Sequence, residues 1–316
     1  LIMISIKNQV WADNISPLVS VLCPTYKHVQ YIRKCLDSIL SQETSFRVEV
    51  IVRDDASTDG TTEILREYQT AYPDLVKCIF ETENQYVKGI RALPVLVRHA
   101  TGKYVALCEG DDYWCDNDKL EQQVAMLEQN PNCFMCAAKT RIEEEGKTDA
   151  PSVIFHGLPQ EFLSFEDLFS RCYLHTSTYV MLSYRDVFDR WEKHIRLSDT
   201  ALHLIYSDLG PVVFLPKVVS VYRITGEGVW SRLTEEQKLK EELDLYKSFY
   251  RHFHLKYKKR FFRLLIEQYL RAIKISHKRY RWRSTFSHLV SFLRHTSKSP
   301  IRAYKHVQRL YRNGSL

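Results

Sequence analysis

In the sequence GKYVALCEGDDYWCDNDKL, from Gly102 to Leu120, a short apolar run passes directly into a group of acids. The run from Tyr104 to Cys108 is brief, β-prone and bounded by glycines, which predicts a buried strand. Glu109, Asp111 and Asp112 follow at the carboxyl end of that strand, where open α/β sheets bind their ligands. A hard divalent cation with oxygen ligands would relieve the repulsion among these carboxylates. The alternative is a solvated acidic turn that only ends the strand.

The surrounding sequence alternates strands with helices. Strands are predicted at 19–23, 48–52 and 75–80, and apolar residues recur at helical spacing within 32–40, 64–68 and 89–100. This alternation predicts an α/β domain with a mostly parallel sheet and helices on both faces.

A second polar loop, DDASTDG at 54–60, also follows a predicted strand. A parallel sheet would bring both loops to one edge, where one would contact a nucleotide base and the other would hold a metal ion and a diphosphate. A turn with a helix cap at Thr58 or Asp59 explains the second loop equally well.

Composition places the chain among ordinary globular proteins, with 316 residues, 45% hydrophobic and 26% charged. No apolar run reaches the roughly 18–20 residues that span a bilayer. The N-terminal apolar stretch is short and has no small-residue cleavage site, so we expect no signal peptide and a cytoplasmic location. All eight cysteines precede residue 173, which favours reduced buried thiols over a disulfide framework, and the lone pair Cys133 and Cys136 does not predict a zinc site.

The net charge of +7 conceals an asymmetry between the two parts of the chain. Residues 251–316 hold 18 Lys and Arg against one acid, Glu267, whereas residues 1–250 hold 27 basic and 37 acidic residues. The split predicts a working domain of acidic balance followed by a basic helical tail that meets an anionic surface.

Four motifs together resemble family 2 glycosyltransferases, which have the GT-A fold. VSVLCPTY (19–26), IVRDDASTDGT (51–61) and the stretch at 102–120 are similar to their nucleotide-binding half. SDTALHLIYSDLG with LPKVVSVYRITGEGVWS, within 197–231, is similar to the acceptor half of bacterial members. The resemblance implies a GT-A-like, Rossmann-like catalytic domain at 1–232, divided at about residue 130, and a basic helical region at 233–316.

The resemblance also assigns the nucleotide contacts. Pro24, Thr25 and Tyr26 match the segment that lies along the nucleotide. Asp55 matches the carboxylate that accepts a hydrogen bond from the uracil ring. Arg91 stands where a basic residue often meets the donor.

The metal site follows from the same resemblance. Glu109 and Asp111 are the ends of a DxD-like motif written E-x-D, with Asp112 adjacent, which in the family binds ribose and a Mg²⁺ or Mn²⁺ that bridges the diphosphate. Glu109 departs from the commoner Asp, and its longer side chain favours an outer position. Thr225 stands where the family often has His, so water and Asp111 would complete the coordination.

On the acceptor side, Asp199 matches the family's catalytic base, although capping of the following helix is the alternative role for it. Arg223 and Trp230 flank a loop that would close over the donor, or they serve surface pairing and core packing. His175 either lines the acceptor cleft or is a buried structural histidine.

The function that the resemblance implies is metal-dependent, inverting transfer of a sugar from a nucleotide-sugar, expected to be a UDP-sugar. The acceptor would be a saccharide or a polyprenyl-linked saccharide in bacterial surface-polysaccharide synthesis (capsule or lipopolysaccharide). The alternative is an inactive relative that acts as a scaffold. For the basic tail, an anionic membrane surface at the inner face of the plasma membrane and a solvated helical bundle stay open, and specific nucleic-acid binding is not expected.

Overall fold

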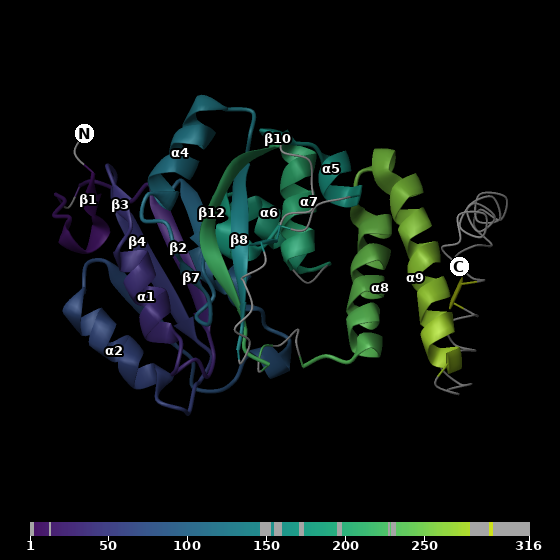
Figure 1. Ribbon diagram of the computed structural model, residues 1–316, viewed down its shortest axis with the longest axis horizontal. Helices are drawn as coiled ribbons and strands as arrows, with labels where there is room; N and C mark the ends of the chain where they lie inside the picture. The colour runs from purple at the N-terminus through teal and green to yellow at the C-terminus, as the bar shows by residue number, and fades with distance from the viewer. Residues whose placement is uncertain are drawn as a thin grey trace. The chain divides into compact units, whose positions relative to one another are not determined.

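The structure is a computed structural model that describes residues 3–12, 14–145, 153–154, 160–170, 174–194, 198–226, 228, 232–278 and 291–292. The chain divides into two compact units, residues 1–226 and 227–316. The helices and strands of both units are labelled in Figure 1.

The first unit is built on a sheet whose strands follow the order β10-β12-β8-β11-β6-β2-β4-β5. The strands in chain order are β2 (Val19–Thr25), β4 (Val48–Asp54), β5 (Val76–Phe80), β6 (Tyr104–Leu107), β7 (Tyr113–Trp114), β8 (Met135–Glu144), β9 (Val153–Ile154), β10 (Phe162–Leu163), β11 (Val180–Leu182) and β12 (Val212–Ile224). The short strands β1 (Ile4–Ser5) and β3 (Glu43–Thr44) form a separate pair.

The half of the sheet that runs β6-β2-β4-β5 is entirely parallel. Val21 at the centre of β2 pairs with Val50 of β4 on one side and with Ala106 of β6 on the other. The four strands predicted from the sequence are all present within two residues of the expected bounds. Their carboxyl ends therefore share one edge of the sheet.

The other half of the sheet is mixed. The long ladder between β8 and β12 is parallel, whereas β11 pairs antiparallel with both β8 and β6 and so joins the two halves. The short strands β7 and β10 pair antiparallel with β12. The expectation of a mostly parallel α/β sheet is confirmed for the long ladders, and the antiparallel pairs are all short.

Seven helices belong to this unit in the described part of the chain: α1 (Ile32–Leu40), α2 (Thr61–Ala71), α3 (Ala92–His99), α4 (Lys119–Gln129), α5 (Phe165–Ser170), α6 (Arg185–Glu192) and α7 (Asp199–Leu209). Single turns of 3₁₀ helix lie at η1 (Ile6–Asn8), η2 (Tyr86–Lys88) and η3 (Thr176–Thr178). Helix α3 begins three residues later than predicted, since Gly89 has a φ of +84° and ends η2. Pro94 then falls in the first turn of α3, where its missing N–H costs no helical hydrogen bond.

Helices cover both faces of the sheet, as expected. Val19, Val21 and Cys23 of β2 share one buried cluster with apolar residues of α1, α2 and α4. Side chains alternate along a strand, so Ser20 and Leu22 point to the opposite face, where α3 packs against β2 and β4. Figure 1 places α1 and α2 beside β2 and β4 on the first of these faces.

The second unit is a helical hairpin of α8 (Glu235–His252) and α9 (Lys258–Lys278), joined through the turn η4 (Leu255–Tyr257). Thr234 and Gln237 form a reciprocal capping box at the start of α8. Leu239 and Leu243 of α8 pack with Leu265, Tyr269 and Ala272 of α9. The helical region expected at 233–316 is present as α8 and α9, and most of the residues after 278 lie outside the described part of the chain.

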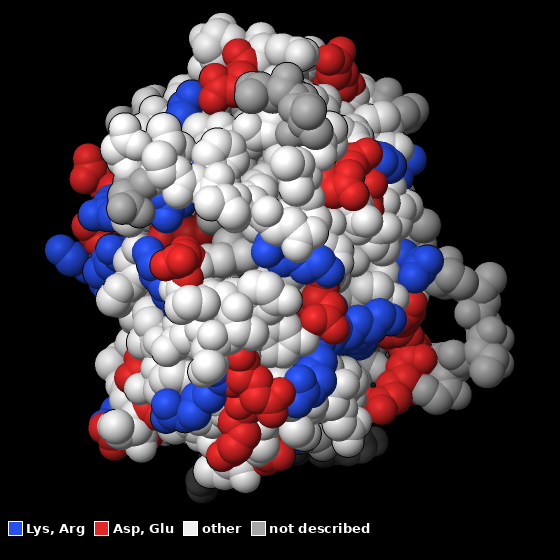
Figure 2. Space-filling view, turned by 90° about the vertical axis from the view of Figure 1, so that its left-hand side faces the viewer, with Lys and Arg blue, Asp and Glu red and all other residues white. Residues whose placement is uncertain are grey.

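No helix among the described residues is long and apolar enough to span a membrane. Basic and acidic side chains are interspersed on the face shown in Figure 2, with no continuous field of one sign. The seven cysteines that the structure describes are free thiols, as the sequence predicts.

Candidate active site

The two acidic loops flank the carboxyl end of β2. Loop 108–112 follows β6 and loop 55–60 follows β4, and both strands are hydrogen-bonded neighbours of β2. Gly110 N donates to Pro24 O (3.0 Å), and Asp55 N donates to Thr25 O (3.1 Å). The predicted nucleotide segment therefore lies between the two predicted acidic loops.

The DDASTDG loop holds the segment that follows Thr25. Ser57 Oγ accepts from Lys27 N (2.8 Å), Thr61 Oγ1 accepts from His28 N (2.9 Å), and Asp59 Oδ2 accepts from Val29 N (3.1 Å). Asp59 Oδ1 also accepts from Thr61 N (3.1 Å). The N-cap of α2 is nevertheless Gly60, with φ +102°, so the expectation that Thr58 or Asp59 is the cap residue was wrong. The loop's hydrogen bonds fix the backbone of residues 27–29.

The two carboxylates at the start of that loop differ in their partners. Asp54 is a buried anchor whose oxygens accept from Ser57 N (3.1 Å) and Thr62 Oγ1 (2.5 Å). Asp55, 7% exposed, accepts from Gln85 N (2.9 Å) and Tyr86 N (3.0 Å). Each carboxylate oxygen has a second lone pair, so Asp55 retains acceptor capacity while it fixes residues 85–86.

Arg91 and Arg53 stand next to this segment. The Arg91 guanidinium lies 4.2 Å from the Tyr86 ring centroid, and its Nη1 is buried without a hydrogen-bond partner among the described residues. Arg53 is 2% exposed and lies 2.8 Å from Glu81 through Nε and 3.4 Å from Asp55 through Nη2. Asp55 therefore links Tyr86, on which Arg91 packs, to the end of β4.

Glu109, Asp111 and Asp112 form a compact acidic group, with one oxygen from each lying within 4.8 Å of the others. Asp112 is fully buried. Its Oδ1 accepts from Arg223 N (3.0 Å), whereas Oδ2 has no hydrogen-bond partner among the described residues. Burial, and then repulsion from Asp111 and Glu109, raises the pKa of the Asp112 carboxyl well above its usual range.

This arrangement fits a divalent cation. A buried carboxylate oxygen without a partner costs free energy, and two neighbouring carboxylates add repulsion. A cation with oxygen ligands would relieve both costs at once. Asp111 and Glu109, which were predicted as the ligands, could hold it together with Asp112, since one oxygen of each lies within 4.8 Å of the others.

Arg223, near the end of β12, connects this strand to the acidic loop after β6. Its Nη1 donates to Asp111 O (2.9 Å), and its guanidinium lies 4.5 Å from the Tyr113 ring centroid and 5.4 Å from that of Tyr31. The role of Arg223 beside a loop that closes over the donor stays a prediction. Arg223 nonetheless contacts the acidic loop through both its backbone and its side chain.

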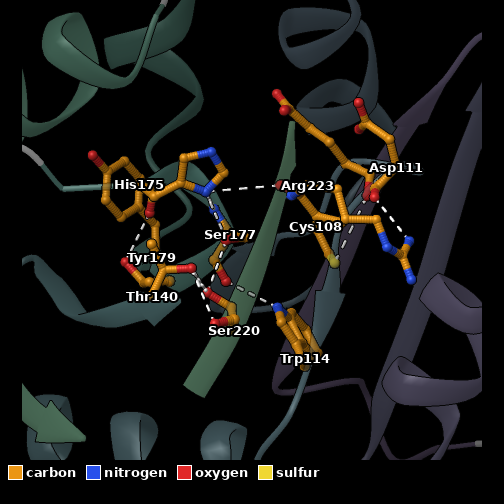
Figure 3. A network of polar contacts seen from close by, with 12 residues as sticks. Cys108, Asp111, Trp114, Thr140, His175, Ser177, Tyr179, Ser220 and Arg223 are labelled. Atoms are coloured by element: carbon orange, nitrogen blue, oxygen red, sulfur yellow. Dashed lines mark hydrogen bonds and ion pairs between the residues drawn. The ribbon is translucent and has the colours of Figure 1, made fainter. Parts of the chain in front are cut away.

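A chain of buried polar contacts joins His175, Ser177, Ser220 and Thr140 (Figure 3). His175, 4% exposed, lies with Nδ1 3.7 Å from Asp112 Oδ2 and 2.7 Å from Ser177 Oγ. Ser177 Oγ donates to Ser220 Oγ (2.9 Å), which donates to Thr140 Oγ1 (2.8 Å). Burial lowers the pKa of His175, so this histidine is a buried, hydrogen-bonded residue next to the acidic group.

Asp199 is the first residue of α7. Ser198 is the cap, because its side chain accepts from Ala201 N (3.4 Å), so the alternative role of Asp199 as the helix cap is taken by its neighbour. Burial, and then the charges of Asp112, Asp111, Glu109 and Asp199, raises the pKa of Tyr222 to about 12. The Tyr222 phenol therefore lies within electrostatic reach of Asp199 and of the acidic group alike.

The structure brings together most of the predicted residues. Pro24, Thr25, Asp55 and the acidic group lie around the end of β2, whereas Tyr26 is 38% exposed at the rim. Thr225 directly follows β12, and Trp230 lies outside the described residues.

The sequence analysis missed His28, which lies 3.8 Å from Asp111 through Nε2. It also missed why the acidic motif contains Gly110, where a Cβ would lie 2.5 Å from Thr25 Oγ1 and 2.8 Å from His28 Nδ1. Neither role shows in local spacing, because His28 and Asp111 lie 83 positions apart in the sequence.

Comparison with known proteins identifies the class to which this fold and site belong. The family model for glycosyl transferase family 2 matches residues 20–189, and the chain belongs to that family. An uncharacterized protein of Mycobacterium tuberculosis is 35% identical over 228 residues, which cover 71% of this chain and 64% of that protein. The matched region thus spans less than two thirds of the length of this relative.

Other similar proteins have more informative names. A Bacillus subtilis protein that bears the name of a teichuronic acid biosynthesis glycosyltransferase, TuaG, is 32% identical over 133 residues, 42% of this chain and 51% of its own. Staphylococcus aureus TarS 1–349 in complex with UDP-GlcNAc has a TM-score of 0.65 at 15% identity, covering 94% of this chain and 92% of its own. The mannosyltransferase PcManGT of Pyrobaculum calidifontis, in complex with GDP-Man and Mn²⁺, has a TM-score of 0.55 at 18% identity, covering 94% and 88%. These two structures have the GT-A fold expected from the sequence.

Proposed function

We propose that the protein is a metal-dependent, inverting glycosyltransferase that moves a sugar from a UDP-sugar to a saccharide or lipid-linked saccharide. The observation that carries this proposal is the buried Asp112 Oδ2 within the acidic group at the end of β6, which has no hydrogen-bond partner among the described residues. Family membership and the nucleotide-sugars bound by TarS and PcManGT support the donor class. The name of TuaG supports a role in bacterial surface-polysaccharide synthesis.

The proposed mechanism divides the work between the two halves of the first unit. The Pro24–Tyr26 segment and Asp55 would bind and orient the nucleoside, while Glu109 and Asp111 would hold Mg²⁺ or Mn²⁺. When bound, the cation would stabilise negative charge on the departing nucleoside diphosphate. Asp199 would face the anomeric carbon and take the proton of the attacking hydroxyl. An Asp is a weak base toward a sugar alcohol, so this transfer would occur late, as the oxygen becomes acidic.

Replacement of Asp199 tests the assignment of the base. We expect Asp199→Asn to lower transfer by about 10²- to 10⁴-fold, the usual contribution of a positioned acid or base, and to leave donor affinity unchanged. Asp208→Asn, in the last turn of the same helix, is the matched control. Transfer is measured as sugar incorporated into an acceptor extract from a panel of UDP- and GDP-sugars. Full transfer by Asp199→Asn would contradict the role, and no transfer from any donor by the unmodified chain would favour the scaffold alternative.

The charges of the second unit support a peripheral location of the protein at a membrane, where a lipid-linked acceptor would lie. Residues 245–266 carry seven Lys and Arg and no Asp or Glu. We call residues 251–260, which include the turn η4, the hairpin tip. There Arg251, Lys256 and Lys259 are exposed beside Leu255, which is 72% exposed. An exposed apolar side chain among cations is typical of a contact with anionic headgroups.

A further inference from the structure

The loop between β2 and α1 places an imidazole at the acidic group. His28 is fixed through its backbone, because its N–H donates to Thr61 Oγ1 (2.9 Å) and its carbonyl accepts from Ile32 N (2.8 Å) at the start of α1. The side chain is only 20% exposed and faces Asp111. The position of this ring is therefore set by two neighbouring elements rather than by solvent.

The ring is also oriented by its own contacts. Nδ1 lies 3.1 Å from Thr25 Oγ1, and the space beside it exists only because residue 110 is glycine. A Cβ at that position would lie 2.8 Å from Nδ1 and 2.5 Å from Thr25 Oγ1. The glycine in the middle of the acidic motif thus admits the imidazole to the site.

The second ring nitrogen points at a predicted metal ligand. Nε2 lies 3.8 Å from Asp111 Oδ2, which is too long for a hydrogen bond. Two ligands of one octahedral cation with bonds of about 2.1 Å are about 3.0 Å apart when adjacent and about 4.2 Å apart when opposite. The observed separation falls between these limits. Histidines that bind metals commonly donate the other ring N–H to a protein oxygen, and Thr25 Oγ1 is placed to accept it.

We propose that His28 Nε2 is a ligand of the cation that Asp111 binds, with Thr25 as the residue that orients the ring. The proposal rests on the proposed function, because it adds a nitrogen ligand to the donor site of that enzyme. It gives the site a mixed nitrogen and oxygen donor set, which favours Mn²⁺ over Mg²⁺. His28 and Asp111 approach from different elements, so the cation would join the loop after β2 to the loop after β6.

Mn²⁺ binding to the full-length chain tests this directly, without reliance on activity. Binding is measured by electron paramagnetic resonance in the presence of UDP, and electron spin-echo modulation detects nitrogen bonded to the ion. We expect His28→Gln to weaken Mn²⁺ binding by at least about 10-fold and to remove the nitrogen signal. Thr25→Val should weaken binding less and keep the signal. His99→Gln, at an exposed position on α3, is the matched control and should match the unmodified chain.

The outcomes separate this inference from the proposed function. Unchanged Mn²⁺ affinity in His28→Gln, together with loss of binding in Asp111→Asn, would overturn the role of His28 alone. A nitrogen signal that persists in His28→Gln would do the same. Failure of the unmodified chain to bind Mn²⁺ with UDP would overturn both the metal dependence and the ligand. Equal melting temperatures of the variants without Mn²⁺ would confirm that each is folded.

Discussion

At the scale of single residues, the site is shaped by polar atoms that the fold buries without ordinary partners. Asp112 Oδ2, Arg91 Nη1 and Lys119 Nζ are three such atoms. The Asp112 and Arg91 atoms lie where the proposed donor and its cation would bind. A bound ligand would supply the hydrogen bond or metal contact that each atom lacks. Lys119 is the first residue of α4, and its Nζ lies over the Trp114 ring.

Lys119 gives a prediction about stability and pH. The side chain is fully buried, with Nζ 4.3 Å from the Trp114 ring centroid, and burial lowers its pKa from 10.5 to about 7. Above pH 7 the unfolded chain binds more protons at this lysine than the folded chain. Stability therefore rises with pH between 7 and 10.5. Below pH 7 Lys119 is charged in both states, so the full cost of burying the charge is present. We expect Lys119→Met to raise the free energy of unfolding at pH 6.5 by about 1–4 kcal/mol.

The gain should shrink as the pH rises toward 9.5, where Lys119 is neutral in the fold. Denaturant unfolding of the variant and the unmodified chain at several pH values measures this difference. Lys240→Met, at an exposed position on α8, is the control. A gain that is the same at every pH would show that the change in packing, and not the charge, is responsible.

At the scale of elements, the site depends on the contact between the end of β12 and the loop after β6. Arg223 closes that junction by two hydrogen bonds and by contact with two aromatic rings. We expect Arg223→Ala to weaken donor binding by about 10- to 100-fold, because a hydrogen bond from a charged group contributes about 1.5–3 kcal/mol. The measurement is calorimetric titration with UDP and Mn²⁺.

Arg141→Ala is the matched control for Arg223. Arg141 also bonds to Tyr113 (3.3 Å), and it pairs with Glu143 (2.9 Å), but the structure records no bond from it to residues 109–112. Loss of donor binding in both variants would assign the effect to Tyr113 rather than to the acidic loop.

The four strands of the parallel half were predictable from the sequence, whereas β7 to β12 were not predicted. The strands around Val21, Val50 and Ala106 are short apolar runs bounded by polar loops, and each was located within two residues. The strands β7 and β11 were not predicted, because two or three residues carry no periodic pattern and their pairing is decided by tertiary contacts.

The site was predictable only in part, for a related reason. Motifs that directly follow strands revealed the acidic group and Asp55. His28 approaches Asp111 across 83 positions of sequence, and Gly110 is needed for that approach, so neither role is visible in local spacing. The buried chain from His175 to Thr140 likewise links three separate segments.

At the scale of the whole molecule, the charge asymmetry gives a prediction about location. Cations near an anionic bilayer contribute about 1 kcal/mol each, so the hairpin tip should bind vesicles of phosphatidylglycerol and phosphatidylcholine. We expect the triple change Arg251→Glu, Lys256→Glu and Lys259→Glu to abolish co-flotation with these vesicles. The triple control Lys7→Glu, Lys193→Glu and Lys240→Glu changes the same net charge at other exposed positions. Equal loss in both would indicate that net charge, and not the hairpin tip, is responsible.

We propose that a cation and a nucleoside diphosphate bind together at the carboxyl ends of β2 and β6. The most direct measurement is the melting temperature of the full chain with UDP, with Mn²⁺ and with both. A ligand at 100 times its dissociation constant stabilises the native state by about 2.7 kcal/mol. We predict a rise that requires both ligands and is lost in Asp111→Asn but kept in the exposed control Asp74→Asn. A well-folded sample that shows no rise with UDP or any other nucleoside diphosphate, or an equal rise in Asp111→Asn, would contradict the account.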